Sequence, residues 1–454
     1  MRGETLFFYD LETSGLNPRE DRIMQFAGQR TDLDLNPIGE PVNQLIKITD
    51  DTLPNPGAIA VTGITPQDTL RDGIDEAEFA RYAADKIFTP GTIALGYNTV
   101  RFDDEFMRHF FWRNFHDPYE WQWKDDRSRW DLLDVVRLTR ALRPEGINWP
   151  VRDDGKPTNR LELITKLNGI SHEHAHDALA DVFASIEVAK LIRDKQPELY
   201  NYLFTHRDKK SVQKLINLDN KKPFVYASGR YGAEHNFTTV AFPLTAAKNG
   251  NILVADLRYD WQDFFNQPFD KIPFPAVKSF QYNRCPAVAP LGVLSKSDGW
   301  SKISLTSEII EKNLSILLAH PEFAEAARAD IESRPEFPPA IDAESALYDG
   351  FVSDHDKIRC NAVRNAGAND LADFHPDFED ERLPELLLHY KAKNYPSSLS
   401  ESEAKSWQAY RQTRLERKAP AFLEELAKIA TLPGKDFIAE ELKLYFESLF
   451  DADY

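Results

Sequence analysis

The chain has 454 residues, of which 42% are hydrophobic and 28% charged, the composition of an ordinary globular protein with about three domains. No segment approaches the roughly 18 uninterrupted apolar residues of a membrane span, and the first predicted strand begins so soon after Met1 that we expect no signal peptide. The net charge of −18 argues against nucleic-acid binding, unless basic residues gather locally, because a polyanion responds to the local field.

Residues 1–196 predict an α/β unit. Apolar runs at 5–12 and 21–32 predict two strands joined by a turn, and 91–98 predicts a third. Segments 103–115, 129–143 and 175–195 have helical apolar spacing. In the last segment the expected apolar stripe consists of Leu179, Val182, Phe183, Ile186, Ala189 and Ile192, and Pro197 closes the helix. Strands followed by alternating helices predict a mixed sheet flanked by helices.

The sequence changes character after residue 196. Short apolar runs at 224–228, 238–244 and 251–257 alternate with Gly, Asn and Pro turns, which predicts a small β-rich domain over 197–340. The stretch 332–345 is rich in proline and acid and predicts a linker or wrapped connection. Three amphipathic segments, at 383–395, 401–419 and 421–432, predict a helical domain over 341–454.

Two cysteines, Cys285 and Cys360, lie far apart and outside any metal-binding spacing. This usage argues against a disulfide framework and against a cysteine-rich zinc site. We therefore expect a cytoplasmic protein.

Asp10 and Glu12 stand two residues apart at the end of the first predicted strand, so their side chains share one face. Their mutual repulsion would raise one pKa unless a positive charge lies between them. Two readings follow: a pair of solvated acids at a surface strand end, or a pair that shares a divalent cation.

Further acids lie at the margins of other predicted elements. Asp103 follows a second apolar strand, in a polar turn that opens a helix, where ordinary capping also explains an acid at 103 or 104. Asp181 precedes the core-facing Val182 and should be partly buried, so it needs a partner; His176 stands five residues earlier. Four carboxylates and a histidine suit two Mg²⁺ or Mn²⁺ ions that activate a water, with the histidine removing its proton.

Three motifs carry a resemblance to a known superfamily. They are FxDxETxG (Phe8, Asp10, Glu12, Thr13, Gly15), N..RFD (Asn98, Arg101, Phe102, Asp103) and HxxxxD (His176, Asp181). In this order and at these separations they resemble the motifs of the DEDDh exonucleases, whose exonuclease domain is ribonuclease H-like. The resemblance implies a 3′–5′ exonuclease with two Mg²⁺ ions, for which Mn²⁺ can substitute. Asp10, Glu12 and Asp181 would be metal ligands, Asp103 would support the second metal, and His176 would be the general base.

The stretches 56–67, 96–123, 128–150, 202–210 and 346–357 resemble one branch of that superfamily, the exodeoxyribonuclease I family. That family joins an α/β exonuclease domain to an SH3-like β domain and a C-terminal helical domain, which form a groove for single-stranded DNA. The resemblance also implies a monomer that acts with single-stranded-DNA-binding protein in DNA repair and recombination, without a membrane.

Basic and aromatic residues interleave between 107 and 130. Aromatic side chains stack on bases at roughly 1–3 kcal/mol each and arginines follow phosphates, although such rings can equally form the core. By resemblance, the DNA contacts are Glu12, Arg108, Tyr119, Trp123, Arg137, Arg160 and Lys209, with Asn251, Tyr348 and Ser353 as further candidates. Arg160 is the strongest candidate for gripping a phosphate near the acids.

Three other functions remain open. An exoribonuclease would use the same carboxylates, but small RNA-trimming relatives generally lack the domains beyond residue 196. A non-catalytic strand-binding scaffold is disfavoured by the intact acidic set. A zinc hydrolase would need partners for His172, His174 and His176, and the sequence offers no matching cluster. The basic run at 414–418 is interpreted as a solvated helix face.

Overall fold

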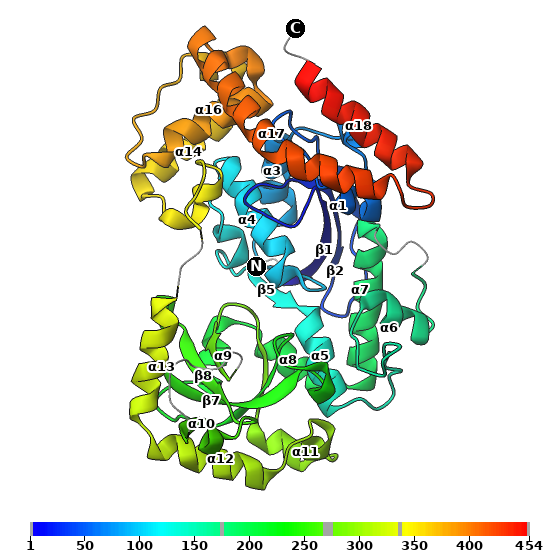
Figure 1. The fold of residues 1–454 in the computed structure, drawn as a ribbon, viewed down its shortest axis with the longest axis vertical. Coiled ribbons are helices and arrows are strands. Elements are labelled where there is room, and N and C mark those ends of the chain that lie inside the picture. The colour runs from blue at the N-terminus through cyan, green and yellow to red at the C-terminus, as the bar shows by residue number, and fades with distance from the viewer. Residues whose placement is uncertain (1–2, 173–176, 267–275, 335–337, 452–454) are drawn as a thin grey trace.

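The computed structural model describes residues 3–172, 177–266, 276–334 and 338–451. Two five-stranded sheets and a set of C-terminal helices organise it, with the second sheet and the C-terminal helices on opposite sides of the first sheet (Figure 1). No helix among the described residues combines the length and the apolar character that crossing a bilayer requires.

The first sheet has the strand order β3-β2-β1-β4-β5. Its strands are β1 (Thr5–Thr13), β2 (Ile23–Thr31), β3 (Val42–Leu45), β4 (Thr92–Gly96) and β5 (Ser128–Asp131). The central strand β1 pairs antiparallel with β2 and parallel with β4. The predicted mixed sheet is therefore confirmed.

Helices cover both faces of this sheet (Figure 1). The helices of this region are α1 (Pro56–Thr62), α2 (Pro66–Asp72), α3 (Glu76–Tyr82), α4 (Asp103–Arg113), α5 (Leu132–Leu142), α6 (Leu161–Leu167) and α7 (Ala178–Lys195). Leu6 and Phe8 share a core with the buried face of α7, whereas Phe7 and Tyr9 pack with α3 and α4. Because side chains alternate along a strand, Asp10 continues the face that α7 covers.

The sequence did not predict β3 or the helices α1, α2, α3 and α6, and two of the predicted elements differ in detail. Residues 129–131 belong to β5, which runs parallel to β4, and the helix begins only at Leu132. On α7 the expected apolar stripe is buried except at Leu179, which is partly buried, and at Phe183, which is 40% exposed. Pro197 ends α7 as predicted and also starts the next helix.

The second sheet has the order β10-β6-β7-β8-β9 and is antiparallel throughout. Its strands are β6 (Phe224–Ala227), β7 (Thr238–Ala246), β8 (Ile252–Asp256), β9 (Val277–Phe280) and β10 (Ala287–Pro290). This confirms the β-rich middle. Prediction missed the helices around it: α8 (Pro197–Thr205), α9 (Lys209–Leu215), α10 (Trp261–Phe265), α11 (Gly299–Lys302), α12 (Ser307–Ala319) and α13 (Glu322–Ser333).

The end of the chain is helical, as predicted. Its helices are α14 (Asp354–Asn365), α15 (Ala368–Ala372), α16 (Arg382–Asn394), α17 (Glu401–Ile429) and α18 (Asp436–Asp451). The two segments expected at 401–419 and 421–432 form one helix, because α17 continues through Pro420. Helix α17 returns to pack on α1, and α18 packs on both α1 and α2, so the C-terminal helices brace the first-sheet unit (Figure 1).

A buried network of ions joins these helices to the first sheet. Arg22 Nη2 lies 2.5 Å from Glu344 Oε2 and 3.3 Å from Asp51 Oδ2. Asp51 is also paired with Lys393 at 3.3 Å and with Arg414 at 3.4 Å. Burial would raise the pKa of Asp51, but the three cations outweigh it and hold that pKa well below its usual value.

The interpretation of residues 414–418 as a solvated face is therefore wrong. Arg414 is buried in the ion network, and Arg417 and Lys418 form ion pairs with Glu20. The basic run is the side of α17 that docks on the first-sheet unit.

Candidate active site

Three carboxylates converge where β1 ends beside α7. One oxygen each of Asp10, Glu12 and Asp181 lie within 4.8 Å of one another. Asp10 and Glu12 share a strand face, and Asp181 lies in the first turn of α7, which Asp177 caps by accepting the Ala180 N–H at 3.0 Å. All three side chains are partly buried, and burial raises the pKa values of Asp10 and Glu12, so the two acids are not a freely solvated pair.

The turn after Glu12 explains the rest of the first motif. Thr13 donates its hydroxyl to the Gly15 carbonyl at 2.7 Å, and a Cβ at Gly15 would collide with the Asp21 carboxylate. The Ser14 hydroxyl accepts the Arg22 N–H at 2.8 Å. Because Arg22 belongs to the buried ion network, the C-terminal helices help to fix the turn beside the acids.

Asp103 approaches the cluster from α4, the helix that follows the neighbouring strand β4. It is the first residue of α4, is buried, and accepts the Leu11 N–H at 3.2 Å. Asp104 has a different environment, since it accepts from the Tyr9 hydroxyl at 2.5 Å and pairs with Arg129. The geometry thus places Asp103, and not Asp104, beside Asp10.

The electrostatics of the cluster favour a cation. Burial, reinforced by Asp181 and Asp177, raises the pKa of Glu12 to about 8. Burial and then Asp103, Asp181 and Glu12 raise the pKa of Asp10 well above its usual value. The strongest electrostatic neighbours of both groups are other carboxylates, so the acids are short of positive charge. An all-oxygen set of this kind fits Mg²⁺ or Mn²⁺.

Of the histidines, His176 lies outside the described residues, so the structure does not show its position. His172 does reach the cluster: its Nε2 lies 2.5 Å from Asp181 Oδ1 and its Nδ1 lies 3.1 Å from Thr165 Oγ1 on α6. Sequence analysis considered His172 only as a zinc ligand, together with His174 and His176, and disfavoured that function. The expectation that Asp181 needs a buried partner was the observation that could have pointed to His172.

The predicted DNA contacts fall into two groups. Trp123 is 65% exposed, Lys209 is exposed, and the Arg160 side chain is also 65% exposed while pairing with Glu162 at 2.6 Å. Tyr348 is 47% exposed, and its hydroxyl is hydrogen-bonded to Glu105 and Arg108. A ligand can reach each of these side chains without a change in the fold.

In the second group, other contacts already engage the side chains of Arg108, Arg137 and Ser353. Arg108 is buried and bonds Glu105 at 2.7 Å and Gln122 at 3.0 Å. Arg137 pairs with Asp134 at 2.5 Å. Ser353 caps α14 by accepting the Asp356 N–H at 3.1 Å, and Asn251 lies in the turn between β7 and β8.

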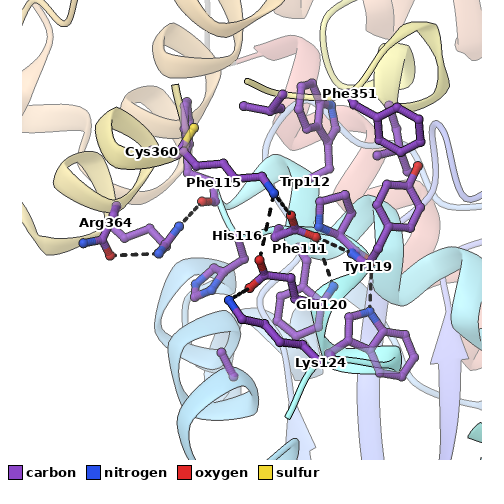
Figure 2. Close-up of a pocket in the computed structure, with 18 of the residues that line it drawn as sticks. Phe111, Trp112, Phe115, His116, Tyr119, Glu120, Lys124, Phe351, Cys360 and Arg364 are labelled. Carbon is purple, nitrogen blue, oxygen red and sulfur yellow. Dashed lines mark hydrogen bonds and ion pairs between the residues drawn. The ribbon is translucent and has the colours of Figure 1, made fainter. Parts of the chain in front are cut away.

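A cavity of about 590 Å³ lies between the end of α4 and the C-terminal helices (Figure 2). Tyr119 and Phe351 meet at its rim with ring centroids 5.8 Å apart, and the Arg108 guanidinium lies 6.0 Å from the Tyr119 ring. Phe351 is 88% exposed, which is unusual for a ring of this size. Prediction missed it, although it lies inside the 346–357 stretch that carried the resemblance.

Comparison with protein families gives three matches in chain order. Residues 7–189 match the model described as "Exonuclease", residues 207–330 match "Exonuclease I SH3-like domain", and residues 341–449 match "Exonuclease I C-terminal domain". Exodeoxyribonuclease I of Escherichia coli (strain K12) is 40% identical over 439 residues, covering 93% of this chain and 92% of the relative.

The chain belongs to the exodeoxyribonuclease I family. The Haemophilus influenzae exodeoxyribonuclease I is 39% identical over 443 residues, 94% of this chain and 93% of that one. Among solved structures, E. coli exonuclease I in complex with a dA16 oligonucleotide superposes with a TM-score of 0.93 at 37% identity, over 98% of this chain and all of the other. The zinc-bound form of the E. coli complex with single-stranded DNA gives 0.92 at 36% identity, over 99% of this chain and 100% of that one. The resemblance and the fold class predicted from sequence are confirmed.

Proposed function

We propose that this chain is a divalent-metal-dependent 3′–5′ exonuclease that degrades single-stranded DNA to 5′-mononucleotides. The observation that carries the proposal is the convergence of Asp10, Glu12 and Asp181 within 4.8 Å, with pKa values raised by burial and by one another. The DNA complex of the E. coli relative supports the substrate. The 3′–5′ direction of degradation is proposed from membership of the exodeoxyribonuclease I family.

Asp10, Glu12 and Asp181 would hold one metal ion, and Asp103 would support a second. When bound, such a pair of ions activates a water and stabilises the leaving oxygen of a phosphodiester. We propose Mg²⁺, with Mn²⁺ as a substitute, because hard carboxylate oxygens and no thiolate make up the site. His176 is proposed as the base that takes the proton of the attacking water.

The DNA strand would approach from the side of α4, α5 and the second sheet. Arg160, at the start of α6, is free to turn from Glu162 to a phosphate. Trp123 and Phe351 offer exposed rings for stacking, the partly buried Tyr119 ring lies beside Phe351, and Lys209 and Tyr348 would add polar contacts. Arg108 and Arg137 are proposed to contribute positive charge from their buried ion pairs, and Asn251 and Ser353 to contact the strand farther along.

Other features follow from the family and remain proposals. They are domain boundaries at 1–196, 197–340 and 341–454, a monomeric state, action with single-stranded-DNA-binding protein in DNA repair and recombination, and a cytoplasmic location. Two buried free thiols, Cys285 and Cys360, fit a reducing compartment.

The test is a time course on a 5′-labelled single-stranded DNA, with Mg²⁺ or EDTA, beside an RNA of the same sequence. We expect the wild type to shorten the DNA from its 3′ end, only with metal and far faster than the RNA. Asp181→Ala should bind the DNA and leave it intact. Equal cutting of RNA would favour the exoribonuclease, and binding without cleavage by the wild type would favour the scaffold.

A further inference from the structure

Resting on the proposed function, we propose that His172 is a positioning residue for the metal ligand Asp181. In this account its Nε2–H holds one oxygen of the Asp181 carboxylate and leaves the other to face the metal. His172 would thus act through Asp181 without touching substrate or metal itself.

The first support is the geometry of the contact. His172 Nε2 lies 2.5 Å from Asp181 Oδ1, and the imidazole is 3% exposed. Its second nitrogen is anchored by Thr165, whose Oγ1 lies 3.1 Å away and which is fully buried. A ring held at both nitrogens and shielded from water has one orientation, so it can impose one on the carboxylate.

The second support is the count of protons. The Thr165 hydroxyl has one proton to give and lies 3.1 Å from His172 Nδ1 and 3.1 Å from the carbonyls of Leu161 and Glu162. A carboxylate that ligates a metal is ionised and can only accept a hydrogen bond. In the proposed arrangement Nε2 therefore donates to Asp181, and Nδ1 accepts the Thr165 hydroxyl.

The third support is the placement of the anchor. Thr165 lies on α6, the seven-residue helix that begins directly after Arg160, and α6 packs on α7, which carries Asp181. One short element thus holds both the proposed phosphate-gripping arginine and the anchor of a metal ligand. The hydrogen-bonded series Thr165–His172–Asp181 fixes their relative position.

The test compares two amides that imitate different ring nitrogens. In His172→Gln the side-chain nitrogen matches Nε2 and can still donate to Asp181. In His172→Asn it matches Nδ1 and reaches only toward Thr165. Mn²⁺ affinity is measured by electron paramagnetic resonance on DNA-free protein, with Asp10→Asn as the control that lacks a proposed ligand. Thermal melts of the metal-free variants check folding.

We expect His172→Asn to weaken Mn²⁺ binding about 10–100-fold, and His172→Gln to stay within a few-fold of the wild type. Turnover of His172→Asn on DNA should recover at saturating Mn²⁺. If His172→Asn does not fold, Thr165→Val provides the test, because it frees the ring at Nδ1 and should weaken binding about 3–10-fold, less than loss of the donor.

The inference is overturned if His172→Asn, or Thr165→Val in its place, binds Mn²⁺ as the wild type does, or if both amides weaken binding equally. A loss of turnover that saturating Mn²⁺ does not restore, with unchanged affinity, would overturn it in favour of proton transfer. If the wild type binds Mn²⁺ no better than Asp10→Asn, the proposed function itself fails. If the wild type binds better and His172→Asn equals it, only the role of His172 fails.

Discussion

Replacing a catalytic acid should make the metal-free protein more stable at alkaline pH. Glu12 is partly buried among like charges, and its pKa is raised from 4.5 to about 8. The unfolded chain releases this proton near pH 4.5 and the folded protein only near pH 8. Between these values the unfolded state binds fewer protons, so stability falls as the pH rises. Glu12→Gln removes the ionisation while keeping the shape of the side chain.

At about 1.36 kcal/mol per pKa unit, ionising Glu12 in the metal-free fold at pH 8.5 costs on the order of 4 kcal/mol. Because water reaches part of the side chain, we expect the variant to gain about 2–4 kcal/mol. For a unit of about 200 residues that corresponds to roughly 5–15 °C in the melting temperature.

The assay is a thermal melt in EDTA at pH 5 and pH 8.5, followed by circular dichroism. Glu12→Gln should melt higher than the wild type at pH 8.5 and nearly with it at pH 5. The exposed Glu78→Gln should melt with the wild type at both. A Glu12→Gln protein that melts at or below the wild-type temperature at pH 8.5 would refute the reasoning that the acids strain the metal-free fold.

Three further outcomes are expected. The stabilisation that Mg²⁺ or Mn²⁺ gives in a thermal melt should grow from pH 6 to pH 8.5, because metal must displace protons from Asp10 and Glu12 at the lower pH; a pH-independent stabilisation would contradict the site. Lys393→Met should destabilise the protein by about 3–5 kcal/mol in urea unfolding, because it leaves Asp51 and Glu344 buried with less positive charge; a neutral effect would show that the ion network does not hold the C-terminal helices. Phe351→Ala should weaken binding of a single-stranded oligonucleotide by about 1–3 kcal/mol in fluorescence anisotropy, with metal affinity unchanged; unaltered binding would remove the ring from the strand's path.

Local patterns were sufficient to predict most of the first sheet and its acids. Two carboxylates at alternate positions of an apolar strand share a face whatever the rest of the chain does, so the pairing of Asp10 with Glu12 follows from strand geometry alone. Asp103 and Asp181 each stand where a helix begins, and short connections bring such ends to one edge of a sheet. In the structure Asp10, Glu12 and Asp181 converge within 4.8 Å, and Asp103 is close enough to raise the pKa of Asp10.

What the sequence did not predict depends on tertiary contacts. The strand at 129–131 is too short to show an alternation of apolar and polar residues, and it forms because β4 pairs with it. Helix α17 continues through Pro420 because its neighbours Leu415 and Phe422 are buried against other elements, which offsets the hydrogen bond that proline removes.

Polar groups were the hardest to place. The basic run at 414–418 has the pattern of a solvated face, and its contacts with the distant acids Glu20, Asp21, Asp51 and Asp342 make its burial tolerable. His172 is one of three closely spaced histidines in a polar segment, and its proposed role follows from the fold that brings Thr165 and Asp181 to its two nitrogens. Neither partnership leaves a local pattern in the sequence.

The central claim is that the converging acids hold the metal ions of a nuclease. Crystals soaked in Mn²⁺ and measured for anomalous scattering test it most directly. The account predicts one anomalous peak among Asp10, Glu12 and Asp181, and a second beside Asp103 when a single-stranded oligonucleotide is bound. Saturating Mn²⁺ that leaves no peak among these carboxylates, or peaks only elsewhere on the protein, would contradict it.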